Sequence, residues 1–170
     1  NNPTTILVKV SHVAARLDFS QFDVTLKGFE GNPTVVFDEA KFVNLQQNGK
    51  IVEGDASVNV KDGAFLNRSN RIGTRWTDMG TAYGYANQYR QDSEMNTALY
   101  VKFTVDGRTF EKTYPINPAG ITKEVDHNGI KGGYLYDIKV RWTITPDWGD
   151  STIEFYTRDW VHNSIPEIVL

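Results

Sequence analysis

Few side chains in this sequence are spaced as a catalytic or metal site requires. The three histidines, His12, His127 and His162, are too far apart for a local metal motif, whose ligands follow one another within a few residues. Each also has an ordinary structural interpretation, since His12 falls at an expected bend and the other two lie in turns rich in Asn, Gly or Ser. We therefore predict no metal site, and no other cofactor is indicated.

Acidic residues could support two kinds of chemistry. Asp147 and Asp150 could offer oxygen atoms to calcium, but a calcium site takes roughly six to eight oxygens, so a hairpin loop is the better interpretation of residues 146–150. Glycoside cleavage needs two facing carboxylates, and four acidic residues lie on or beside expected strands: Glu111, Asp137, Glu154 and Asp159. All four also stand where an outward polar residue is expected, so we assign no catalytic residue.

Aromatic residues gather in one irregular stretch of the sequence. Trp76, Tyr83, Tyr85 and Tyr89 lie there among glycines and polar residues. Their rings could form a platform for sugars or for another surface contact. They could also cover one end of the folded domain, because aromatic rings supply a large buried area wherever strands are short. We favour this second interpretation.

The composition excludes several functional classes. A formal charge of -3 leaves no basic surface of the kind that binds nucleic acid, so we expect no nucleic-acid partner. No apolar run approaches the roughly 20 residues of a membrane-spanning helix. The absence of cysteine excludes disulfides and thiolate chemistry. The sequence also contains no nucleophile elbow, phosphate loop or dinucleotide fingerprint, and we predict that the chain is not an enzyme.

Alternation of apolar and polar residues is the strongest structural signal, because a period of two places every second side chain on one face of a strand. Residues 134–144 follow this pattern and predict a long, half-buried strand. Residues 99–105 and 110–116 predict a hairpin around Asp106 and Gly107, a pair that favours tight turns. Residues 153–160 and 165–170 predict another pair, with Pro166 favouring an edge position for the last strand.

Two regions interrupt the alternation. Apolar residues occupy even positions within residues 6–10 and odd positions within residues 13–19, so the side of the strand that faces the core changes between them. This change predicts a bulge or a bend near Ser11 and His12. Between residues 59 and 97 the alternation fades among Gly, Asn, Ser, Arg and Tyr. We expect a long irregular excursion there, with short elements that include a short helix within residues 75–95.

The pattern as a whole predicts an all-β protein. Short strands, frequent turns and almost no helical periodicity favour an antiparallel β-sandwich, with a barrel as the alternative. No repeat, low-complexity tract or interior linker divides the sequence. We therefore expect residues 1–170 to form a single domain.

Three stretches together resemble the fimbrillin-like proteins of Bacteroidales, a family of major, minor and accessory fimbrial subunits. Residues 10–19 are similar to the family's early strand, with His12 where an arginine is common. Residues 97–116 are similar to the family's hairpin, in which a strand, an Asp-Gly turn and a second strand ending in Tyr-Pro-Ile follow one another. Residues 134–140 are similar to the strand that comes next, although Gly132 and Gly133 stand where the family usually has an Arg-Asn pair. The third stretch is the late strand at residues 153–160.

The resemblance implies a transthyretin-like, Greek-key β-sandwich that is exported to the outer membrane and cell surface as a lipoprotein, with its lipidated cysteine upstream. It implies either one domain of a two-domain subunit or a small accessory subunit. In this family an arginine-specific protease removes the first strand, and a strand from a neighbouring subunit fills the groove that is left. Such a strand satisfies exposed N–H and C=O groups and apolar pockets together.

Carried onto this sequence, the family's assembly mechanism assigns roles to both ends of the chain. The displaced strand corresponds to residues 6–10, with three apolar side chains: Ile6, Val8 and Val10. Arg16 is the arginine nearest to this strand and is therefore the candidate residue for cleavage by the arginine-specific protease. The candidate donor strand is the tail at residues 165–170, with Ile165, Ile168 and Leu170. The tail could equally be the domain's own last edge strand, because edge strands look the same in sequence.

These observations favour a structural or adhesive subunit of a bacterial surface fimbria. Its expected partners are other fimbrial subunits, bound by strand addition, and a host or bacterial surface ligand or glycan. An exported carbohydrate-binding module is the alternative, motivated by the four aromatic residues of the irregular stretch. An exported β-sandwich hydrolase is a third hypothesis.

Overall fold

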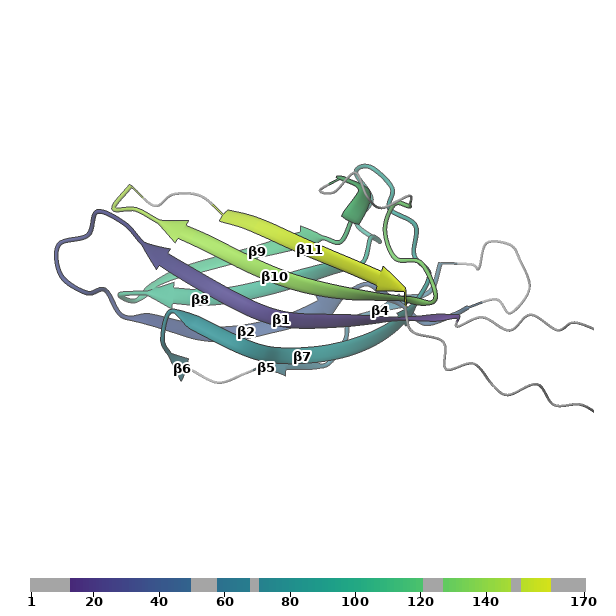
Figure 1. Cartoon of the computed structure of the whole chain (residues 1–170), viewed down its shortest axis with the longest axis horizontal. Coiled ribbons are helices and arrows are strands. Elements are labelled where there is room, and N and C mark those ends of the chain that lie inside the picture. The colour runs from purple at the N-terminus through teal and green to yellow at the C-terminus, as the bar shows by residue number, and fades with distance from the viewer. Residues whose placement is uncertain (1–12, 50–57, 68–70, 121–126, 148–150, 160–170) are drawn as a thin grey trace, which may run out of the picture.

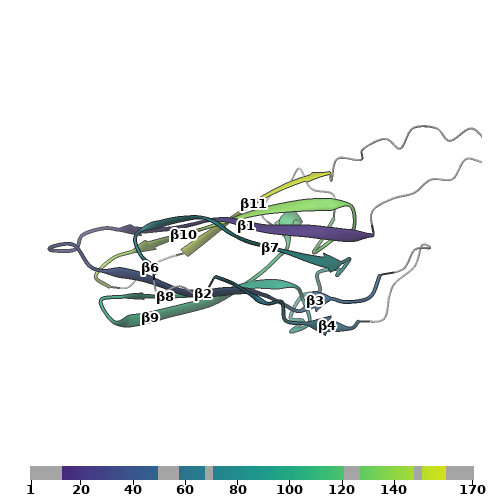
Figure 2. The same ribbon diagram turned by 90° about the horizontal axis from the view of Figure 1, so that it is seen from below.

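Two β-sheets lie face to face and enclose the core between them, as the two views of the molecule show (Figure 1, Figure 2). The computed structural model describes residues 13–49, 58–67, 71–120, 127–147 and 151–159, and for the last of these ranges it describes the backbone alone. Within these residues there is no helix that is long and apolar enough to cross a membrane.

The first sheet has the strand order β11-β10-β1-β7. Its strands are β1 (Ala14–Leu26), β7 (Arg75–Tyr85), β10 (Tyr134–Ile144) and β11 (Ser151–Asp159). The second sheet has the order β5-β2-β8-β9, with β6 also pairing with β2. Its strands are β2 (Val35–Val43), β5 (Phe65–Asn67), β6 (Arg71–Ile72), β8 (Ala98–Val105) and β9 (Arg108–Pro115). The remaining elements are short: β3 (Leu45–Gln46), β4 (Val60–Lys61) and the 3-10 turn η1 (Pro118–Gly120).

The predicted all-β sandwich is confirmed, and the barrel alternative is wrong because the described strands form separate sheets that do not close on themselves. The two clearest sequence patterns are also confirmed. Residues 134–144, in which apolar and polar residues alternate, form β10, and residues 99–116 contain the β8–β9 hairpin. Asp106 and Gly107 turn that hairpin with φ angles of 46° and 78°, the positive values that a tight two-residue turn needs. One pairing departs from the antiparallel expectation, since β1 and β10 run parallel.

β1 is one long strand with a bulge in its middle. Its register shifts between Phe19 and Gln21 against both neighbouring strands, so Ser20 is an extra residue. The bulge changes which residue parity faces the core: Leu17 and Phe19 are buried before it, and Phe22 and Val24 after it. The bend predicted near Ser11 and His12 lies outside the described residues.

Aromatic rings from both sheets meet in the centre of the core. The Phe22 ring lies 5.4 Å from the Phe37 ring and 5.3 Å from the Phe103 ring, and both contacts are edge-to-face. Trp142 packs on Phe103 at 5.0 Å. Because these residues come from β1, β2, β8 and β10, their packing joins the two sheets across the sandwich.

The irregular excursion expected at residues 59–97 contains more strand than the sequence predicts. Residues 75–85 form the eleven-residue strand β7, so the short helix expected within residues 75–95 is wrong. A bulge in β7 interrupts its alternation of apolar and polar residues. Asp78 and Gly80 adopt φ angles of 53° and 142° there, and Asp78 and Met79 together lie opposite Ser20, the extra residue of β1. Trp76 and Met79 are both buried as a result, although three positions separate them.

The segment after β7 has little regular structure but many side-chain hydrogen bonds. The side-chain amide of Asn87 donates to the Thr97 hydroxyl at 3.0 Å and to the Met95 carbonyl at 2.9 Å. The backbone of Asn87 also forms an isolated bridge with Ile130. Asn87 is buried, so these bonds fix the segment against the end of the sandwich.

We predict that replacing Phe103 with alanine lowers the free energy of unfolding by about 3–5 kcal/mol, because it removes a fully buried ring from the centre of the aromatic cluster. Urea denaturation followed by tryptophan fluorescence measures the change. Ile72→Ala is the control, since Ile72 is 75% exposed and its loss should change the free energy by no more than about 0.5 kcal/mol. A loss below about 1 kcal/mol for Phe103→Ala would contradict the described core.

Candidate assembly and surface sites

Arg16, the candidate cleavage residue, lies near the start of β1 and is paired on both sides. Its position is opposite Tyr83 of β7 and Leu135 of β10. Its Nε donates to Asp18 Oδ1 at 2.9 Å, and the Thr81 hydroxyl donates to the same oxygen at 2.7 Å. A protease that cuts here must first separate the beginning of β1 from both neighbouring strands.

The start of β1 and the end of β11 lie on either side of the start of β10. The Gly133 N–H, just before β10, donates to the Ala14 carbonyl at 2.9 Å. On the other side, Asp159 pairs with Tyr134. The described parts of the chain therefore begin and end at the same end of the first sheet (Figure 1). The candidate strands themselves lie outside the described residues: Ile6, Val8 and Val10 of the displaced strand, and Ile165, Ile168 and Leu170 of the tail.

The four aromatic residues singled out in the sequence do not form one platform. Trp76 is 3% exposed and packs on Phe22 and Phe37, so its assignment as a surface contact is wrong. Tyr83 is 56% exposed. Tyr85 lies against the backbone of Gly49, where a Cβ atom would come within 2.1 Å of its ring. Tyr89 is partly buried in the segment after β7.

Of the carboxylates considered for glycoside cleavage, Glu111 and Asp137 do not face one another, because they lie on different sheets. Glu111 lies on β9 of the second sheet, where its side chain accepts a hydrogen bond from the Tyr100 hydroxyl at 2.9 Å. Burial and this hydrogen bond raise the pKa of Tyr100 to about 12. Asp137 lies on β10 of the first sheet, and the alternation of both strands turns the two carboxylates away from the core. Glu154 and Asp159 are on β11, where the backbone alone is described.

The two remaining polar candidates within the described residues, His127 and Asp147, have structural partners. The Nε2 atom of His127 is 2.8 Å from the Tyr136 hydroxyl, which also accepts the Lys131 N–H at 2.7 Å. Burial raises the pKa of this tyrosine. Asp147 accepts a hydrogen bond from the Thr145 hydroxyl in the connection between β10 and β11. Within the described residues, no three His, Asp or Glu side chains gather as metal ligands, and His12, His162 and Asp150 lie outside this part of the chain.

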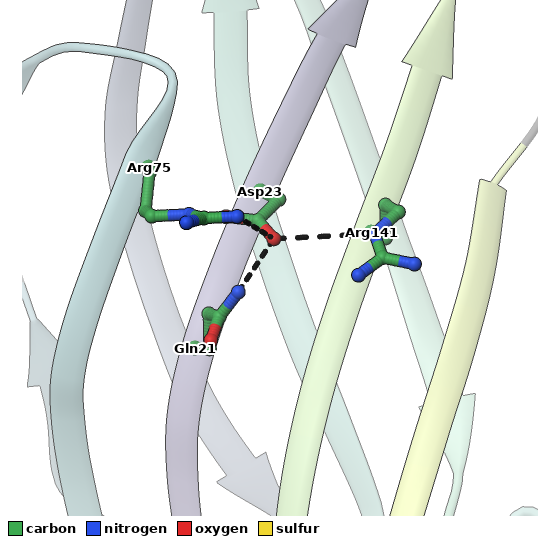
Figure 3. A network of polar contacts seen from close by, with 4 residues as sticks. All are labelled: Gln21, Asp23, Arg75 and Arg141. Carbon is green, nitrogen blue, oxygen red and sulfur yellow. Dashed lines mark hydrogen bonds and ion pairs between the residues drawn. The ribbon is translucent and has the colours of Figure 1, made fainter.

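A charged network around Asp23 joins three neighbouring strands of the first sheet (Figure 3). Arg75 Nε, from β7, donates to Asp23 Oδ1 at 2.8 Å, and Arg141 Nε, from β10, lies 3.9 Å from Oδ2. Gln21 donates to Oδ2 from the same strand at 2.6 Å. Asp23 is 6% exposed, so these groups replace the water that its carboxylate has lost.

The charge of Asp23 is stabilised in the folded state. Burial alone would raise the pKa of its carboxyl group. Hydrogen bonds from Arg75 and Gln21, and the positive charges of Arg75 and Arg141, outweigh burial and hold this pKa below its ordinary value of 3.8. The sequence does not predict this network, because Arg75 and Arg141 are far from Asp23 along the chain and only the strand register places them opposite it.

The fold is shared with solved structures of bacterial surface proteins. A protein from Parabacteroides distasonis that is described as a cell adhesion protein matches with a TM-score of 0.68 and 20% sequence identity, over 88% of this chain and 52% of that one. Another protein so described, from Bacteroides eggerthii, matches with a TM-score of 0.51 and 15% identity, over 88% and 56% of the two chains. No protein-family profile and no curated protein sequence matches.

These likenesses define the class of fold. The chain has the β-sandwich fold of Bacteroidales cell adhesion proteins, so the resemblance to fimbrillin-like proteins is confirmed at the level of the fold. The chain spans about half the length of the solved structures that it matches.

We predict that Asp23→Asn lowers the free energy of unfolding by about 1–3 kcal/mol at pH 7, because the variant loses the charge that holds Arg75 and Arg141. The folded pKa of Asp23 is depressed, so its contribution is present above pH 3.8 and is lost as the pH falls through the folded value. The difference between wild type and variant should therefore shrink in acid, as measured by urea denaturation at several pH values.

Asp92→Asn is the matched control for this experiment. Asp92 is an exposed turn residue with a φ of 56°, a conformation that asparagine also tolerates, and its substitution should change stability little at any pH. A difference between wild type and Asp23→Asn that stays constant from pH 7 to pH 3 would contradict the described network.

Proposed function

We propose that this chain is a structural or adhesive subunit of a bacterial surface fimbria, without enzymatic activity. The observation that carries the proposal is its likeness to a Bacteroidales cell adhesion protein over most of the chain, at a TM-score of 0.68. On this proposal residues 1–170 are one sandwich domain of an exported, lipidated protein at the outer membrane, and its partners are other fimbrial subunits.

We propose further that the subunits assemble by strand addition at the beginning of β1. Cleavage after Arg16 would remove Ala14, Ala15 and Arg16 together with the residues before them. These three residues pair with positions 83–85 of β7, and Arg16 also pairs with Leu135 of β10. Their loss would leave backbone N–H and C=O groups on both neighbouring strands without partners, and an incoming strand would satisfy them.

The tail at residues 165–170 is the proposed donor. Its apolar residues Ile168 and Leu170 are two positions apart and would share one face of an added strand, while Ile165 would lie on the other face. The chain leaves β11 beside the start of β10, which is the same end of the sheet where cleavage would open the strand pairing. A tail that reaches the equivalent place on a neighbouring subunit would link the subunits end to end.

We predict that brief digestion with an arginine-specific protease produces a new N-terminus at Leu17 and a ladder of detergent-resistant multimers on an unboiled denaturing gel. Arg16→Lys should abolish both results, because lysine keeps the positive charge but not the cleavage specificity. Arg108→Lys, at an exposed position at the start of β9, should behave like the wild type. A wild-type protein that is cut after Arg16 and stays monomeric would contradict assembly by strand addition.

Deletion of residues 165–170 distinguishes the two interpretations of the tail. If the tail is the donor, the deletion should abolish the multimer ladder and leave the free energy of unfolding of the uncut monomer unchanged. If the tail is the domain's own edge strand, the deletion should lower the stability of the monomer, because it removes strand pairing within one chain. The gel and urea denaturation of the uncut protein measure these outcomes separately.

A further inference from the structure

β9 lies at one edge of the second sheet, beside β8 (Figure 2). All eight of its residues pair with β8 without a register shift, from Arg108 opposite Val105 to Pro115 opposite Ala98. On the other side of this sheet, β5 and β6 have only three and two residues. Within the described residues, β9 is therefore the long and regular edge of the second sheet. A strand from another molecule can pair with an edge of this kind.

The two-residue turn at Asp106 and Gly107 determines which backbone groups of β9 point away from the sheet. The two residues that flank such a turn exchange hydrogen bonds, and bonded residues then alternate along the hairpin. The even-numbered residues of β9 therefore bond to β8, and the N–H and C=O groups of Thr109, Glu111 and Thr113 point outward. All three residues are exposed, and no other described strand pairs with them.

Two cations lie along this edge. Arg108 and Lys112 are exposed and share the face of β9 that is directed toward the first sheet, with Phe110 between them. The Arg108 Cζ atom lies 5.5 Å from the centre of the Phe110 ring, and the Lys112 Nζ atom lies 5.2 Å from that of the Tyr114 ring. On the opposite face, Glu111 accepts a hydrogen bond from the Tyr100 hydroxyl. These contacts hold the charges beside the outward backbone groups.

Pairing of β9 with β9 of a second copy would bring like charges together. Two antiparallel copies related by a two-fold axis place residues of the same face opposite one another. A pair centred on Phe110 puts Arg108 of each copy opposite Lys112 of the other. A pair centred on Glu111 or on Lys112 puts that residue opposite its own counterpart. Like charges directly opposite destabilise a strand pair, so this edge disfavours a second copy of itself.

We propose that the edge of β9 is a docking surface for an antiparallel strand of another protein that carries acidic side chains opposite Arg108 and Lys112. The same two cations exclude a second copy of this chain. The incoming backbone bonds to Thr109, Glu111 and Thr113. Its acidic residues occupy non-hydrogen-bonded positions, where opposite Cα atoms are only about 4.5 Å apart and side chains are closest. The surface is on the other sheet from the start of β1, and the proposal does not depend on fimbrial assembly.

The double variant Arg108→Glu/Lys112→Glu tests the proposal, because its β9 is itself a strand with acidic residues at the required spacing. Paired with wild-type β9 about Phe110, both of its new carboxylates face cations, whereas a pair of two variant chains again brings like charges together. We expect each uncut protein alone to be a monomer and an equimolar mixture to form a 1:1 heterodimer. Size-exclusion chromatography with light scattering measures the mass, and thermal denaturation shows that the variant is folded.

Lys112→Glu alone provides a second measurement that does not rely on the double variant. This single variant should form a homodimer, because Arg108 of each copy then faces the new carboxylate of the other copy. Its mass should therefore shift from that of the monomer to that of the dimer. A raised salt concentration should reverse the shift, because salt screens exposed charges.

Lys27→Glu/Arg71→Glu is the matched control, because it changes the net charge of the chain equally at two exposed positions outside β9. Mixed with the wild type, it should remain monomeric. A wild type that dimerises by itself, a mixture of folded wild type and double variant that stays monomeric, or a monomeric Lys112→Glu would each overturn the proposal. Equal binding of the control variant would also overturn it, since recognition would then not depend on β9.

Discussion

The first sheet depends on β1, because this strand is hydrogen-bonded to β10 on one side and to β7 on the other. Its bulge at Ser20 lets one strand place Leu17 and Phe19, and then Phe22, in the same core. Phe22 in turn contacts rings from the second sheet, so the pairing of β1 also determines how the two sheets pack. A change at β1 therefore affects both layers.

The polar face of β1 is as organised as its apolar face. Near its end, Asp23 joins Arg75 and Arg141 across three strands, and near its start Asp18 binds Arg16 and Thr81. The network around Asp23 is the firmer of the two, because the Asp23 carboxylate is buried and has three partners, whereas both members of the Arg16–Asp18 pair are partly exposed. This difference would allow residues 14–16 at the start of β1 to separate from the neighbouring strands while the rest of β1 stays paired.

The sequence predicts the elements whose signals are local. Alternation identified β10, and Asp106 with Gly107 identified the β8–β9 turn. The sequence missed β7 because a bulge shifts its alternation, and for the same reason it did not identify Trp76 as a core residue. Contacts between distant residues could not be predicted, since the register of β1 alone brings Asp23 to its arginines.

The central claim is that the tail of one subunit pairs where residues 14–16 of another have been removed. A photo-reactive residue at the exposed position 86, just after β7, tests this claim in a mixture of isotope-labelled and unlabelled protein that has been cut after Arg16. We predict cross-links from position 86 of one copy to residues 165–170 of a copy with the other isotope. Cross-links that join only residues of the same copy, or that never reach the tail, would contradict the account.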